Sequence, residues 1–186
     1  MCQICEGKSL EGLKELTIND CKSITNIPEV EGLEKLYIWN CPLLEMIPQI
    51  EGLKCLCCWN CPSVSKIPHI VGLQELYFGE SVWMNPIPCP LLTEIPHIEG
   101  LKRLECMNCT SLTSIPPIEG LQILNCNRCL SLSSIPYIKG LLELHCVECP
   151  KLSAIPYNES LQVLNNKNCN ILHQRHQIID ISSEGY

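Results

Sequence analysis

The chain has 186 residues, a formal net charge of −7 and a hydrophobic content of 46%. This length is sufficient for one domain with a substantial core. The acidic balance argues against nucleic acid as a partner, because phosphate backbones attract basic surfaces. No apolar run of about 18 residues occurs, so the sequence predicts neither a membrane span nor a membrane partner.

The first dozen residues, MCQICEGKSLEG (1–12), form a degenerate lead-in that we expect to cap the rest of the chain. They lack a basic head followed by an apolar run, so no secretory signal is expected. Sixteen cysteines in a chain without such a signal indicate free thiols rather than a disulfide framework. We therefore expect an intracellular, reducing compartment.

A repeat of 20 residues occupies 13–172. It reads Leu-x-x-Leu-x-[Ile/Cys]-x-x-Cys-x-x-Leu-x-x-Ile-Pro-x-Ile-x-Gly and occurs in eight copies. A fixed period of this length is typical of a solenoid, in which each repeat forms one turn. The Ile-Pro pairs, which are 20 residues apart except for one step of 28, begin at positions 27, 47, 67, 95, 115, 135 and 155.

Each copy alternates apolar and variable positions, which predicts a short strand. In the second copy, Leu36 and Ile38 face one way, while Tyr37 and Trp39 face the other. One strand per turn would stack into a parallel sheet. The return segment contains Pro and Gly and is too short for a regular helix, so we expect extended or 3₁₀ structure there. The sequence thus predicts a β-rich solenoid with almost no α-helix.

The repeat resembles the leucine-rich repeat family. The stretches LEKLYIWNCPLLEMIPQIEG (33–52) and LKRLECMNCTSLTSIPPIEG (101–120) show the resemblance best. Its short length and Ile-Pro pair are similar to leucine-rich repeat proteins of giant DNA viruses and to bacterial effectors. The resemblance implies a right-handed superhelix with its parallel sheet on the concave face and the return segments on the convex face.

The one spacing of 28 residues between successive Ile-Pro pairs reflects an eight-residue insertion near 79–88. The motif CPLLTEIP (89–96) closely matches CPLLEMIP (41–48), so half a repeat is duplicated. The inserted loop carries Trp83. A loop with a tryptophan is a candidate binding element, and an insertion tolerated on the solenoid surface is the alternative.

Twelve of the sixteen cysteines fall at two inward positions of the repeat. Some of them form Cys-x-x-Cys pairs, the spacing of half a zinc site. However, other copies place Ile38 and Phe78 at the same position, so it is a packing position. We interpret these thiols as small core side chains that donate to backbone carbonyls, and we expect no cofactor. The twelve are Cys21, Cys41, Cys61, Cys89, Cys109, Cys129, Cys149 and Cys169 at one position, and Cys58, Cys106, Cys126 and Cys146 at the other.

The outward strand positions gather large aromatic side chains in the second to fourth turns. Cys55 and Cys57 occupy outward positions among them and are expected to be exposed thiols. An exposed aromatic cluster usually marks a partner site, whereas rings that only cover the sheet are the alternative. This aromatic patch consists of Tyr37, Trp39, Cys55, Cys57, Trp59 and Tyr77, with Trp83 on the adjoining loop.

The last segment, 173–186, departs from the repeat and is expected to form a C-terminal cap or tail. Terminal turns of a solenoid expose strand edges and apolar ends. A homodimer formed through these ends is therefore an additional expectation.

The chain shows neither a glycine-rich phosphate loop nor a nucleophile–histidine–acid set, so we expect no enzyme. With the resemblance, the sequence favours a protein that binds another protein through its concave face. The resemblance implies a viral or pathogen effector or scaffold, with a host protein as one partner. The substrate-recognition module of a ubiquitin ligase, acting with a separate chain, is an alternative. A cysteine-based metal-binding protein is an alternative of another class.

Overall fold

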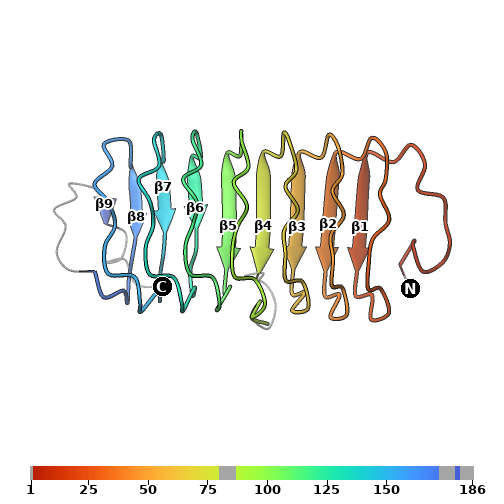
Figure 1. Cartoon of the computed structure of the whole chain (residues 1–186), viewed down its shortest axis with the longest axis horizontal. Coiled ribbons are helices and arrows are strands. Elements are labelled where there is room, and N and C mark those ends of the chain that lie inside the picture. Colours follow the sequence, from red (N-terminus) through yellow and green to blue (C-terminus); the bar gives the residue numbers. More distant parts are fainter. Residues whose placement is uncertain (1, 80–86, 172–178, 181–186) are drawn as a thin grey trace.

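The computed structural model describes residues 2–79, 87–171 and 179–180. Within these residues the repeats form parallel strands that follow one another in chain order in a single sheet (Figure 1). The last strand comes from the segment expected to be the C-terminal cap. The strands are β1 (Glu15–Asn19), β2 (Lys35–Trp39), β3 (Cys55–Trp59), β4 (Glu75–Gly79), β5 (Arg103–Met107), β6 (Ile123–Asn125), β7 (Glu143–His145), β8 (Val163–Asn165) and β9 (Ile179–Asp180).

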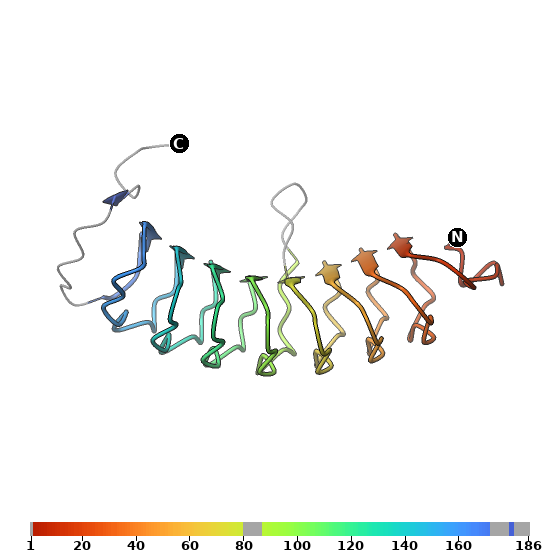
Figure 2. The same ribbon diagram turned by 90° about the horizontal axis from the view of Figure 1, so that it is seen from above.

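Equivalent repeat positions stand directly beside each other from strand to strand. Leu36 pairs with Leu56 between β2 and β3, and the pairing continues across the 28-residue step, where Leu76 meets Leu104. The strands line the inner side of a gentle curve (Figure 2), so the sheet forms the concave face. The chain runs down each strand, returns in front of the sheet and advances from right to left in Figure 1, which is a right-handed coil. The expected solenoid is confirmed.

The core lies between the sheet and the return segments and consists of stacked columns of aliphatic and cysteine side chains. Leu104 and Leu124, on adjacent strands, are both 0% exposed. The return segments consist of extended chain and turns, and the described residues include neither α-helix nor 3₁₀-helix. Proline and glycine recur at the same points of these segments, which explains why extended chain is preferred over helix.

Most of the described turns contain two residues with left-handed backbone. One is the repeat glycine, such as Gly32 with φ of 76°. The other precedes the cysteine after the strand, where Asn40 and Asn60 have φ of 52° and 55°. Asparagine tolerates this conformation better than most residues. The Asn60 amide donates to the Asn40 Oδ1 at 3.0 Å, and Asn40 donates to Asp20 at 2.9 Å, so this column is bonded from turn to turn.

Gly79 ends β4, where the chain leaves the sheet toward the insertion. Its φ is 103°, and a Cβ at this position would lie 1.9 Å from the Met107 carbonyl oxygen. Trp39 and Trp59 occupy the same column on β2 and β3. The aromatic column therefore stops at Gly79 because backbone of the next turn occupies the space that a side chain would need.

Replacement of Leu104 by Asp tests the core. The variant buries an unpaired carboxylate and should lower the free energy of unfolding by more than about 3 kcal/mol. Urea unfolding followed by circular dichroism measures this loss. The control is Gln122→Asp at an exposed position, which should change the free energy by less than about 0.5 kcal/mol. Equal stabilities of the two variants would show that Leu104 does not face the core.

Replacement of Gly79 by Ala tests the close approach of β4 and β5. We expect a loss of more than about 2 kcal/mol, from the left-handed backbone and the clash with Met107 together. Gly72→Ala is the matched control, because Gly72 also has a positive φ but nothing within 4 Å of the added Cβ. It should lose only about 1 kcal/mol in the same thermal or urea unfolding experiment. A Gly79 variant as stable as the Gly72 variant contradicts the predicted clash.

Candidate functional site

The aromatic side chains of β2, β3 and β4 form one continuous cluster on the concave face. Trp39 and Trp59, paired across the two strands, stack with ring centroids 5.9 Å apart and planes 15° apart. Tyr37 lies tilted beside Trp39 at 6.1 Å, and Tyr77 meets Trp59 edge-on at 6.0 Å. The strand pairing places Tyr37 and Tyr77 on either side of Cys57.

A charged pair on β5 borders this cluster. The Arg103 guanidinium lies over the Tyr77 ring, 5.6 Å from its centroid, within the range of a cation–π contact. The Glu105 carboxylate accepts a hydrogen bond from Arg103 Nε at 2.8 Å and holds the guanidinium in place. Tyr77 in turn donates its hydroxyl to Glu75 at 3.0 Å. Burial and this carboxylate raise the pKa of Tyr77, so the phenol stays a neutral donor.

Cys55 and Cys57 are not exposed thiols, and the prediction that they would be is wrong. They lie on the outward side of β3 but are only 7% and 3% exposed. Tyr37 and Tyr77 flank Cys57 on the neighbouring strands. Because strands lie about 4.8 Å apart, large side chains on both sides cover a small one between them. The Cys55 thiol, 4.0 Å away, and burial raise the pKa of Cys57 well above its usual range.

Two polar atoms in the cluster lack a partner. The indole Nε1 atoms of Trp39 and Trp59 are shielded from solvent, and among the described residues neither has a hydrogen-bond acceptor. A buried donor without an acceptor costs about 1–3 kcal/mol. Stacking of the two indole rings stabilises the pair by about 0.5–1.5 kcal/mol, which offsets only part of the cost of the two unpaired donors.

The structure thus brings together six of the seven residues of the predicted patch on three adjacent strands. Two of the six, Cys55 and Cys57, lie beneath the rings rather than at the surface. Trp83, the seventh, lies outside the described residues.

Seven of the twelve inward cysteines donate to backbone carbonyls, as the sequence analysis predicts. The Cys129 thiol donates to the Cys106 carbonyl of the preceding turn at 3.0 Å, and Cys149 donates to the Cys126 carbonyl at 3.1 Å. In earlier turns the bond stays within the turn, as from Cys61 to the Trp59 carbonyl at 3.3 Å. These thiols are therefore hydrogen-bond donors in the core. All sixteen cysteines are free.

The polar half of the concave face has a structural role that the sequence analysis missed. Asn127 accepts a bond from the Val147 N–H at 2.7 Å through its Oδ1. Asn125 accepts one from the Asn127 N–H at 3.2 Å. The strands β6 and β7 end after three residues, and beyond their ends these side-chain oxygens accept hydrogen bonds from backbone N–H groups in place of strand carbonyls.

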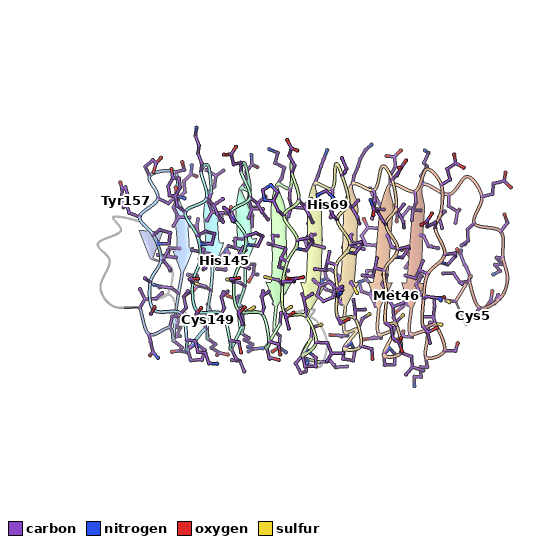
Figure 3. The ribbon with its side chains drawn as sticks, viewed as in Figure 1. Cys5, Met46, His69, His145, Cys149 and Tyr157 are labelled. Atoms are coloured by element: carbon purple, nitrogen blue, oxygen red, sulfur yellow. The ribbon has the colours of Figure 1, made fainter. Side chains whose placement is uncertain are left out.

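A group of three thiols at the N-terminal end was also missed. Cys2 and Cys5 of the lead-in meet Cys21, which follows β1, with all three Sγ atoms within 4.8 Å of one another. Figure 3 shows Cys5 at this end, beyond β1. The available signal was the Cys-x-x-Cys spacing at 2–5, which lies outside the repeat.

Thiol labelling tests the corrected position of Cys55 and Cys57. In the reduced native protein, a bulky maleimide should modify them as slowly as Cys106 and Cys129, because all four are buried. Peptide mass spectrometry after timed quenching gives the rate for each cysteine. The double variant Tyr37→Ala with Tyr77→Ala should speed modification of Cys57 by an order of magnitude or more and leave Cys106 unchanged. Rapid modification of Cys57 in the unmodified chain would show that the rings do not cover it.

Comparisons with protein-family models, with curated proteins and with solved structures gave no match. Among the described parts of the chain, no helix has the length and hydrophobicity that crossing a bilayer requires. Any assignment of function therefore rests on the geometry of the described residues.

Proposed function

We propose that this chain is a non-catalytic leucine-rich repeat protein that binds a protein partner through the aromatic patch. The stacked pair Trp39 and Trp59, with Tyr37 and Tyr77 at its sides, is the observation that carries the proposal. Rigid aromatic area of this kind dominates the energetics of protein interfaces.

The position of the patch supports this proposal. Parallel sheets are normally covered on both faces. Here the return segments cover one face, and no described strand packs on the other. An uncovered parallel sheet with its largest apolar side chains on the open face fits a surface that a partner covers.

The composition of the patch agrees with an interface. Its centre is aromatic. Charged residues stand at its edge, where Lys35 on β2, Glu75 on β4 and Arg103 on β5 share a column with Cys55 on β3. Interfaces combine an apolar centre with a polar rim in this way. Among the described residues, neither of the two indole N–H groups has an acceptor, which ring packing alone does not explain. A partner carbonyl reached by a small rotation of each indole would supply the missing acceptor.

Two inward thiols of the β5 turn are in a structural rather than a nucleophilic state. A nucleophilic cysteine needs a lowered pKa and access to solvent. Cys106 and Cys109 are buried, and hydrogen bonding to neighbouring thiols together with burial raises the pKa of both. Thiols in this state persist best in a reducing compartment, so we place the protein inside cells. By its resemblance to viral and bacterial repeat proteins, we assign it the role of an effector or scaffold that meets a host protein.

Paired substitutions test the proposal. Trp39→Ala with Trp59→Ala should weaken partner binding by about 100-fold or more, since each interface tryptophan contributes about 2 kcal/mol. The melting temperature should fall by only a few degrees, because stacking contributes about 1 kcal/mol. Quantitative mass spectrometry of proteins captured from host-cell lysate by immobilised chain identifies the partner. Titration calorimetry with the purified partner then gives the affinities.

The matched control is Glu143→Ala with His145→Ala, two concave-face side chains of β7 in the polar half. The two side chains lie 3.9 Å from each other, three strands away from β4. The control should bind like the unmodified chain. If the tryptophan variant binds equally well, or the control alone abolishes binding, the patch only covers the sheet.

A further inference from the structure

The thiols of Cys2, Cys5 and Cys21 form a compact triangle at the N-terminal end of the solenoid. Cys2 Sγ lies 3.5 Å from Cys5 Sγ and 3.3 Å from Cys21 Sγ, and Cys5 Sγ lies 3.3 Å from Cys21 Sγ. The Ser23 hydroxyl is beside them, 3.4 Å from Cys5 Sγ and 3.7 Å from Cys21 Sγ. Two segments of the chain thus converge on one small volume.

The lead-in is folded around this triangle by its own turns. The Glu6 N–H donates to the Cys2 carbonyl at 3.1 Å, and the Lys8 N–H donates to the Gln3 carbonyl at 3.1 Å. These turns hold Cys2 and Cys5 beside Cys21 of the first repeat.

We propose that Cys2, Cys5 and Cys21 bind a thiophilic divalent cation, Zn²⁺ in the first place, with water held by Ser23 as the fourth ligand. Zinc–sulfur bonds of about 2.3 Å in a tetrahedron place sulfurs about 3.8 Å apart, so the triangle needs to open by only a few tenths of an ångström. Cys5 is exposed, which leaves a path for the ion.

This assignment separates Cys21 from the cysteines that follow the later strands. Cys41 and Cys61 each donate to the carbonyl two residues before them. The contacts of Cys21 are with Cys2, Cys5 and Ser23 instead. Bound metal would tie the lead-in to the first turn and close an end of the solenoid that otherwise exposes the core.

Cobalt titration tests the site. Reduced, chelator-treated protein under anaerobic conditions should take up one equivalent of Co²⁺ with a thiolate-to-metal charge-transfer band, and one equivalent of Zn²⁺ should displace it. Zinc should also raise the melting temperature. Cys5→Ser should lose the charge-transfer intensity and the thermal shift while keeping the circular dichroism spectrum. The control is Cys169→Ser, which removes the half-buried cysteine near the opposite end and should leave metal binding intact.

X-ray absorption of the zinc-loaded, unmodified chain provides a readout that needs no variant and should show three sulfur ligands and one oxygen. The proposal is wrong if no charge-transfer band develops, if Cys5→Ser binds cobalt as the unmodified chain does, or if zinc has only oxygen and nitrogen neighbours. A disulfide between two of the three cysteines in metal-free protein purified without reductant would also overturn it, since the cluster would then be an oxidisable pair.

Discussion

The solenoid depends on satisfying backbone carbonyls inside a core that repeats every turn. The carbonyls of Cys106 on β5, Cys126 after β6 and Cys146 after β7 each accept a bond from a cysteine of the following turn. An aliphatic side chain there would remove one buried hydrogen bond from each carbonyl, worth about 0.5–1.5 kcal/mol, and the Cys126 carbonyl would keep its bond from the Cys129 N–H at 3.3 Å. A thiol fills the space like a small hydrophobe and donates one proton. This requirement explains why cysteine recurs at a position that packing alone would not specify.

The same stacking that builds the core also creates the concave surface. Because equivalent positions align from strand to strand, one aromatic residue per turn becomes a column, and the pair Trp39 and Trp59 becomes a stack. The column ends at Gly79, where backbone of the next turn prevents any side chain. The close approach of the β5 backbone to Gly79 therefore sets the limit of the aromatic column on β4. The left-handed column of Asp20, Asn40 and Asn60 connects the turns of β1, β2 and β3 beside it.

The fold could be predicted from the sequence because it depends on period, and the period repeats many times. The inward leucines, the parallel register and the left-handed glycines all follow from it. Features that depend on neighbouring turns could not be read from one copy. Cys57 is outward by alternation, yet the tyrosines beside it bury it. The role of Asn127 depends on where β7 ends, and Cys2 and Cys5 lie outside the repeat, so no period aligns them with Cys21.

The thiol–carbonyl bonds can be measured directly. The infrared spectrum of the reduced protein in the S–H stretching region reports each donor, since hydrogen bonding lowers and broadens the stretching band. The structure predicts a shifted band from thiols that exchange slowly in deuterated water, and it predicts that Cys149→Ala removes part of that band and destabilises the fold. Unshifted S–H absorption that exchanges at once, or a Cys149→Ala variant with unchanged spectrum and stability, would contradict the role assigned to these cysteines.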